Sequence, residues 1–87
     1  MSDFYEFCFV VERVEWDENR ETGAYWEDRR ICRVFKTFGA AVSYIESNSA
    51  KTTFPMEWYG DKIYSGSDRK NTKREGLRYE IHYVPLD

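Results

Sequence analysis

The chain has 87 residues, of which 18% are aromatic, and it carries a formal net charge of −3. This length corresponds to one domain, residues 1–87, and no apolar run approaches the roughly 20 residues of a transmembrane helix. Its two cysteines are too few for a disulfide framework or for metal-ligand spacing, and residues 1–4 lack the basic start of a signal peptide. We therefore expect a cytoplasmic protein with no membrane contact, no metal and no cofactor.

Charge is distributed unevenly along the chain. Residues 1–28 contain nine acidic and two basic residues, a net charge of −7, whereas residues 29–87 contain eleven basic and seven acidic residues, a net charge of +4. Opposite electrostatic fields on two parts of a surface bear on binding partners rather than on the fold.

Residues 4–16 have the pattern of a first β-strand. Phe7–Val11 is apolar at every position, as in a strand that is covered on both faces. After Val11 the apolar residues move from odd to even positions. This change predicts either a β-bulge near Glu12, which inserts one residue into the pairing, or a strand that places Val14 and Trp16 on the open face of the sheet.

Residues 17–23 are polar and predict a hairpin turn, and residues 24–35 predict the returning strand. Folding this hairpin about Arg20 places apolar side chains opposite one another, namely Tyr5 with Phe35, Cys8 with Cys32, Phe9 with Ile31 and Val14 with Trp26. The matching favours this register, although it also opposes two acids, Glu12 and Asp28.

Residues 38–47 predict the only helix. Phe38, Ala41, Val42 and Ile45 follow the i, i+3, i+4, i+7 spacing of one helix face. The hydroxyl of Thr37 is suited to cap the first turn, and the polar residues 47–49 favour an end.

The second half of the chain predicts further strands. Residues 52–59 are strand-like, with Pro55 indicating an edge or a bent start. The Gly60-Asp61 pair predicts a two-residue turn with glycine first.

Residues 65–76 are polar and predict a mobile loop. Residues 77–84 alternate strictly between apolar and polar side chains, which is typical of a half-buried strand, and Pro85 is expected to end it.

These elements predict an α+β fold. We expect one antiparallel sheet of four to five strands, in the order ββα followed by ββ or βββ, with the helix packed on one face. The exposed strand edge near Pro55 is compatible with either a monomer or a homodimer.

Catalytic motifs are sparse. Cys8 and Cys32 lie in apolar segments where a thiol behaves as a small hydrophobe, so we expect both to be reduced and slow to react. His82 lies on the polar side of a predicted strand, with no partner beside it in the sequence. Residues 17–23 lack calcium-loop spacing. We expect a protein that is not an enzyme.

The acidic hairpin is the first candidate site. Carboxylates around aromatic anchors complement an Arg- and Lys-rich protein surface, which predicts a protein partner with a basic surface. An equally weighted alternative is that Trp16 and Trp26 serve only to stabilise the hairpin. The predicted partner-binding residues are Glu15, Trp16, Asp17, Glu18, Glu21, Tyr25, Trp26, Glu27 and Asp28.

The basic loop is the second candidate site. Cations beside aromatic rings suit single-stranded nucleic acid, because phosphates pair with the charges and bases stack on the rings. The predicted nucleic-acid-binding residues are Arg69, Lys70, Lys73 and Arg74. This is the alternative function, and a structural or assembly role is a second alternative.

In its short length, single predicted helix and acidic aromatic segment, the chain resembles the small proteins that phages make against host nucleases. The resemblance is one of composition and includes no motif. It implies an inhibitor that occludes a host nucleic-acid-processing or defence complex, and it assigns no role to any individual residue.

Overall fold

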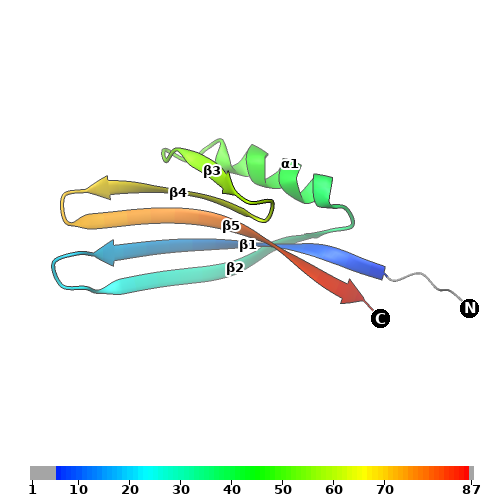
Figure 1. Ribbon diagram of the computed structural model, residues 1–87, viewed down its shortest axis with the longest axis horizontal. Coiled ribbons are helices and arrows are strands. Elements are labelled where there is room, and N and C mark those ends of the chain that lie inside the picture. Colours follow the sequence, from blue (N-terminus) through cyan, green and yellow to red (C-terminus); the bar gives the residue numbers. More distant parts are fainter. Residues whose placement is uncertain (1–5, 87) are drawn as a thin grey trace, which may run out of the picture.

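The computed structural model describes residues 6–86 and shows one five-stranded antiparallel sheet and one helix (Figure 1). The sheet order is β2-β1-β5-β4-β3. This confirms the α+β class and, of the two expected arrangements, the one with three strands after the helix. The elements are β1 (Glu6–Asn19), β2 (Tyr25–Phe35), α1 (Phe38–Ser49), β3 (Met56–Tyr59), β4 (Ile63–Lys70) and β5 (Lys73–Leu86). No helix within residues 6–86 is long and apolar enough to cross a membrane.

Two long central strands give the molecule its elongated shape. β1 and β5 have 14 residues each and pair from Glu6 opposite Leu86 to Asn19 opposite Lys73. At about 3.3 Å per residue such strands span roughly 46 Å, and the molecule measures 59 × 24 × 20 Å. The turns of residues 20–24 and 71–72 lie together at one end (Figure 1), where the Arg20 N–H donates to the Thr72 carbonyl at 2.8 Å. We call this the tip end.

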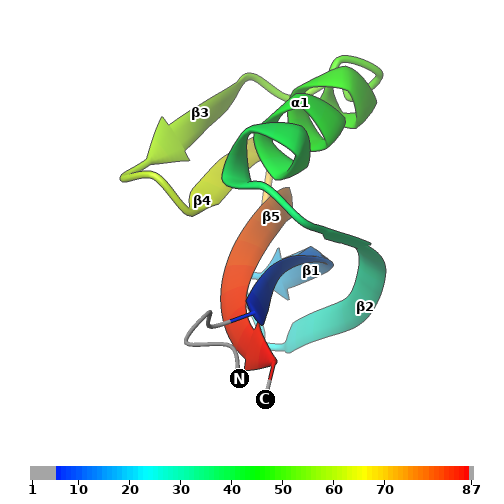
Figure 2. The same cartoon turned by 90° about the vertical axis from the view of Figure 1, so that its right-hand side faces the viewer.

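The hydrophobic core joins α1 to β1 and β5. Its buried members are Val11, Ala41, Ile45, Leu77, Tyr79 and Ile81, and we call the side of the sheet that carries them the core face and the opposite side the outer face. Phe38 and Val42 are half-buried against this cluster, and Figure 2 shows α1 beside one end of β5. Tyr83 shares the alternation of Ile81 but is 52% exposed, and its ring lies against that of Phe7 at 4.8 Å.

The ends of α1 follow from local hydrogen bonds. The Thr37 hydroxyl accepts the Ala40 N–H at 3.1 Å, which confirms the predicted cap. The helix continues to Ser49, two residues beyond its predicted end. The Asn48 amide donates to the Tyr44 carbonyl and the Ser49 hydroxyl donates to the Glu46 carbonyl, so these side chains bond the last turn instead of ending it.

The predicted register of the first hairpin is wrong. Phe9 pairs with Phe35, not with Ile31, and Cys8 pairs with Val84 of β5 instead of Cys32. β1 extends to Asn19, so the turn lies later than predicted and the pairing centre moves past Arg20. Val14 faces Arg29 instead of Trp26. Tyr5 and the predicted start of the strand at residue 4 lie outside the described residues.

The turn that sets this register is built by Asn19. Its side-chain oxygen accepts the N–H groups of Glu21 and Thr22 at 3.0 and 3.2 Å. Gly23 has a φ of +75°, a conformation that glycine adopts without steric cost.

The irregularity in the hairpin occurs where the sequence predicted it, between Val11 and Glu12. The extra residue is nevertheless Cys32 on β2, because Val11 pairs with Arg33 and Glu12 pairs with Ile31. β1 itself keeps an unbroken register with β5. Its side chains therefore alternate regularly, and the second interpretation is right about direction: Val14 and Trp16 lie on the outer face. Val14 is nevertheless fully buried there instead of open to solvent.

The prediction of a mobile loop over residues 65–76 is also wrong. This segment forms most of β4 and the start of β5, joined by a two-residue turn in which Asn71 has a φ of 53°. Its two glycines are needed for close packing. A Cβ atom at Gly76 would overlap the ring of Trp16, and one at Gly66 would overlap the carbonyl of Pro55.

The remaining boundaries correct two smaller expectations. β5 continues through Pro85, which pairs with Phe7 of β1. On the other side of β5, the pairing with β4 ends at Glu80. The missing N–H of Pro85 therefore interrupts no hydrogen bonds between β5 and β4. β3 begins at Met56 and is an edge strand, as predicted near Pro55. Gly60 has a positive φ, but the β3–β4 connection contains three residues instead of two.

Candidate binding site

The structure distributes the predicted acidic hairpin site over two faces. Side chains alternate along β1 and β2, so opposite members of the set point in opposite directions. Glu21 lies in the turn. By register with the core residues, the outer face carries Trp16, Glu18, Tyr25 and Glu27, whereas the core face carries Glu15, Asp17, Trp26 and Asp28.

Part of the core-face set lines a groove at the tip end. The groove has a volume of about 500 Å³ and lies between the hairpin, β5 and the segment that follows α1. We call it the tip groove. Trp26 forms one wall, and the charged lining residues are the acids Glu15, Asp17 and Glu75 and the bases Arg13 and Lys51.

Two carboxylates in the tip groove are unpaired. Asp17 and Glu75 lie directly opposite each other on β1 and β5, and neither forms an ion pair within residues 6–86. The Oδ1 atom of Asp17 is buried and has no hydrogen-bond partner among the described residues. An unsatisfied buried acceptor costs free energy, and the negative charges of Asp17 and Glu75 would attract a cationic group that entered the groove.

Most other acids of the hairpin are already neutralised. Glu15 pairs with Arg13. On β2, Asp28 accepts from Arg30 at 3.0 Å. The charge of the hairpin is therefore less available to a partner than the sequence alone indicates.

The two tryptophans of the hairpin differ in exposure. Trp16 is half-buried on the outer face, where it covers Gly76 and stacks against the Arg74 guanidinium, 5.2 Å from its ring. Trp26 is 56% exposed and forms a wall of the tip groove. Trp16 is thus a packing residue, and Trp26 is the ring that remains accessible.

A network of ion pairs lies on the outer face and was not anticipated. Glu12 and Glu80 are direct partners across β1 and β5. Arg29 Nη1 lies 3.2 Å from Glu12 Oε1 and 3.6 Å from Glu80 Oε1, and His82 Nε2 lies 2.9 and 3.4 Å from the same two atoms. Arg78 donates to Glu80 at 2.5 Å. Residues 12 and 82 are too distant in sequence for any spacing rule to connect them.

The network shifts the acidity of its carboxyl groups. Burial is the largest single influence and raises the pKa of Glu80, but the hydrogen bond and charge of Arg78 together with the charges of Arg29 and His82 lower this pKa by more, so the net shift is downward. The pKa of Glu27 is lowered chiefly by the hydrogen bond from Arg29 and then by that from Tyr25. Both carboxylates are therefore held in the charged form.

The same network contains a set of metal-ligand types. Donor atoms of Glu12, Glu80 and His82 lie within 4.8 Å of one another, and carboxylate oxygens with an imidazole nitrogen are common ligands of divalent metals. The guanidinium of Arg29 already lies against both carboxylates, so the arrangement is satisfied as an ion-pair network.

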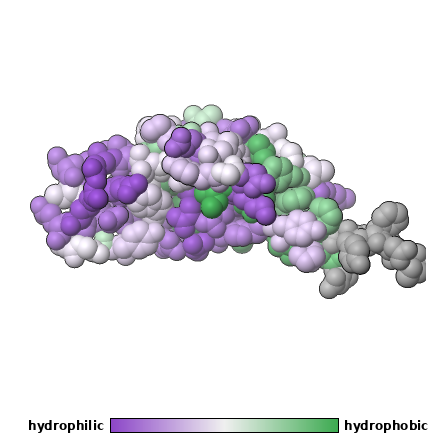
Figure 3. All heavy atoms as spheres, viewed as in Figure 1, coloured by the Kyte–Doolittle hydropathy of each residue, from purple (hydrophilic) through white to green (hydrophobic). Residues whose placement is uncertain are grey.

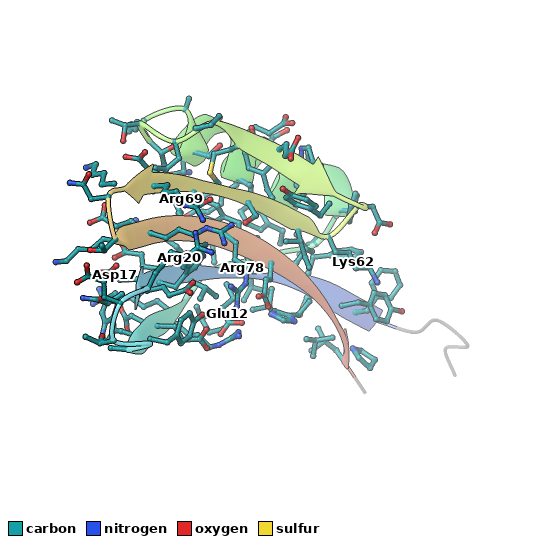
Figure 4. All side chains as sticks on the ribbon, turned by 60° about the vertical axis from the view of Figure 1, so that its left-hand side comes forward. Glu12, Asp17, Arg20, Lys62, Arg69 and Arg78 are labelled. Carbon is teal, nitrogen blue, oxygen red and sulfur yellow. The ribbon has the colours of Figure 1, made fainter. Side chains whose placement is uncertain are left out.

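The predicted basic loop is also divided between the two faces. Arg69 and Arg74 pair directly and belong to the outer face, whereas Lys70 and Lys73 belong to the core face. Lys70 forms an ion pair with Asp68 at 3.7 Å. Figure 4 shows Arg20 and Arg78 on the same side of the sheet as Arg69, so the structure collects arginines that the sequence places in three separate segments.

Comparison of the chain with protein-family models, with curated proteins and with solved structures found no match. The candidate function therefore depends on the geometry described above.

Proposed function

We propose that the chain is a small non-enzymatic binding protein whose tip groove receives a lysine or arginine side chain from a protein partner with a basic surface. The observation that supports this most strongly is that Asp17 lines the groove and forms no ion pair within residues 6–86. Glu75 adds a second carboxylate directly opposite. The exposed ring of Trp26 adds a face on which a cation can stack.

In this proposal α1 packs on the core face at one end of the sheet, and the tip groove occupies the uncovered remainder. The core cluster lies around Val11 and Tyr79, whereas the groove residues Glu15 and Asp17 lie farther along β1 toward the turn. A long sheet beneath a short helix thereby leaves an accessible concave surface on the same face.

Two further acids would speed association. Glu18 and Glu21 lie at or beside the turn and form no ion pair within residues 6–86. Unpaired rim charges mainly raise the association rate of oppositely charged proteins. The residues of the predicted acidic hairpin site that fit the proposal are therefore Asp17 and Trp26 in the groove and Glu21 in the turn, whereas Glu18 adds negative charge from the outer face.

Basic protein surfaces are common where DNA or RNA is bound. We infer that the biological effect is occlusion of such a surface on a nucleic-acid-processing or defence complex. The resemblance of the chain to small phage inhibitors in length and composition agrees with this role.

Titration with an octa-arginine peptide, followed by tryptophan fluorescence, tests the groove. We expect Asp17→Asn and Trp26→Ala each to weaken binding by about tenfold or more, because each removes a contact to the cation. Asp68→Asn is the matched control, since it removes the same charge from the same face where Lys70 already neutralises it. Equal affinities for Asp17→Asn and Asp68→Asn would show that only net charge matters and would refute the groove.

The outer-face arginines favour nucleic-acid binding as a second candidate function. Arg20, Arg69 and Arg74 form no ion pair within the described part of the chain, and Arg74 lies on the ring of Trp16. Phosphates would pair with these guanidinium groups.

Salt dependence tests this second candidate. The double replacement of Arg69 and Arg74 by Ala should lower the slope of log affinity against log salt for single-stranded DNA by about 1.5. The double replacement of Lys70 and Lys73 by Ala removes the same charge from the opposite face and should leave the slope almost unchanged. Absence of binding by the unmodified protein at low salt would exclude the candidate.

A further inference from the structure

The outer edge of β2 is the longest unpaired strand edge in the structure. β2 is the last strand in the sheet order, and no strand within residues 6–86 pairs with its outer side. It has 11 residues, whereas β3 at the opposite edge has four and is preceded by Pro55. Short length and proline are two of the devices that protect an edge against pairing with another chain, and β2 has neither; its charged side chains and its bulge at Cys32 are the protecting features that it does have.

β2 also carries large apolar side chains that the molecule leaves exposed. Tyr25, Trp26, Ile31 and Val34 are 56, 56, 62 and 55% exposed. Exposed apolar groups beside an unpaired strand edge favour the addition of a further strand, because the new ladder would bury them.

The regular part of this edge is Tyr25–Ile31. These seven residues pair with β1 without interruption, and the extra residue Cys32 ends the regular register. The middle residue of the segment is Asp28. When two copies of one strand pair antiparallel about a two-fold axis, the residue at the axis faces itself and the others face their mirror positions.

The sequence of this segment is complementary to itself about Asp28. A two-fold axis there places Glu27 opposite Arg29, Trp26 opposite Arg30, and Tyr25 opposite Ile31. Each of these is a favourable cross-strand combination: an acid with a base, an aromatic ring with a cation, and an aromatic ring with an aliphatic side chain. All three occur twice in a symmetric pair.

The single unfavourable pair is Asp28 with its own copy. Arg30 compensates for it, because its Nε atom lies 3.0 Å from Asp28 Oδ2 on the same face, so two guanidinium groups flank the two carboxylates. Axes at the neighbouring positions are worse. An axis at residue 27 opposes Glu27 to itself and Trp26 to Asp28, and an axis at residue 29 opposes Arg29 to itself and Trp26 to the bulge residue Cys32.

We infer that the chain forms a homodimer in which β2 pairs with β2 of a second copy about a two-fold axis at Asp28, giving a continuous ten-stranded sheet. A two-fold axis perpendicular to the sheet keeps both core faces on the same side. The two tip grooves would then lie on one surface. This inference does not depend on the function proposed for the groove.

A charge exchange between Glu27 and Arg29 tests the pairing. In the proposed dimer, residue 27 of each copy faces residue 29 of the other. Glu27→Arg therefore places two arginines opposite each other, and Arg29→Glu places two glutamates opposite each other. We expect each variant alone to dimerise at least about tenfold more weakly. An equimolar mixture should restore dimers, because two arginines on β2 of one variant then face two glutamates on β2 of the other. Sedimentation equilibrium of the full chain, alone and mixed, measures this.

The mixture separates pairing from folding. Glu27 and Arg29 also bond within one chain, so a single variant can lose stability, and thermal melts of each must accompany the sedimentation. Recovery on mixing can arise only between chains. If neither variant folds, cross-linking replaces the exchange.

Cross-linking uses Asp28→Cys in a chain whose native cysteines are replaced by alanine. Residues opposite each other at the axis bring their Cβ atoms to about 4.5–5.5 Å, which is close to the separation that a disulfide needs. We expect mild oxidation to give covalent dimers of Asp28→Cys and almost none of the matched control Glu27→Cys, which faces residue 29 instead of itself. Three results would overturn the inference. The first is a protein that remains monomeric at millimolar concentration, and the second is equal cross-linking of Asp28→Cys and Glu27→Cys. The third is a dimer that neither Glu27→Arg nor Arg29→Glu weakens.

Discussion

The two ends of the sheet are held together by different interactions. In the part of the molecule that contains α1, six buried apolar residues from α1, β1 and β5 form one cluster, which includes Val11 and Ile45, both fully buried. At the tip end the strands remain paired, but most of their side chains are charged, half-buried or exposed, and Figure 3 shows that end as predominantly hydrophilic on the face in view. One sheet therefore carries an apolar core in one part and an accessible, charged surface at the other end.

Removing apolar volume beneath the helix should have the largest effect. Ile45→Ala deletes a side chain with 0% exposure, and we expect the free energy of unfolding to fall by about 2–4 kcal/mol. Urea denaturation measures the loss. Ser47→Ala, on the exposed side of the same helix, is the control and should change stability by less than about 0.5 kcal/mol. A loss for Ile45→Ala as small as that of the control would remove Ile45 from the core.

The packing of Trp16 on the outer face of the sheet depends on Gly76. Gly76→Ala would force the ring of Trp16 off the strand, and we expect the free energy of unfolding to fall by about 1–3 kcal/mol. Trp16→Leu removes the obstruction, so Gly76→Ala should cost much less in the presence of Trp16→Leu. A double-mutant cycle measured by urea denaturation checks this, and additive losses would contradict the packing of Trp16 over Gly76.

Acid should weaken the outer-face network. The folded-state pKa of Glu80 is lowered, so this carboxylate contributes stability above the pKa of the unfolded chain, about 4.3, and loses it as the pH falls through the folded-state value. We expect Glu80→Gln to flatten the decline of stability between about pH 5 and pH 2. Glu21→Gln, in the turn, should follow the unmodified protein. Matching acid profiles for Glu80→Gln and the unmodified protein would exclude a stabilising role for this carboxylate.

All of these measurements need one fixed protein concentration, because a dimer would make stability concentration-dependent.

Exposed charge pairs at the tip end should have the smallest effect. Lys70 and Asp68 form a pair 3.7 Å long whose side chains are 69 and 40% exposed. Solvent and salt screen such pairs, so we expect Lys70→Ala to change the free energy of unfolding by less than about 0.5 kcal/mol. A larger loss in urea denaturation would mean that the tip end contributes more to stability than its exposure indicates.

Sequence patterns predicted the elements whose burial follows a local period. The spacing of Ala41 and Ile45 identified the helix and its buried face, Thr37 identified its first turn, and the alternation of Leu77, Tyr79 and Ile81 identified the buried side of β5. In each case the signal lies within one element, because the periods of 3.6 and 2 residues are properties of local backbone geometry.

The same patterns gave wrong predictions where the local structure is set by contacts with residues in distant segments. Residues 65–76 are polar, yet they form strands because Gly66 and Gly76 accommodate close contacts with Pro55 and Trp16. The predicted hairpin register is wrong because several alignments of the two strands pair their apolar residues almost equally well. The Asn19 turn and the extra residue Cys32 decide among them.

The amino-acid sequence by itself determined the class of fold, the position and cap of α1, and the identity of the apolar residues that α1 shares with β5. Only the tertiary structure decided that β5 lies between β1 and β4, that the acids of the hairpin point to two different faces, and that Asp17 meets Glu75. The physical reason is that periodicity is set by neighbouring residues, whereas strand order and register are set by contacts between residues as much as 80 positions apart.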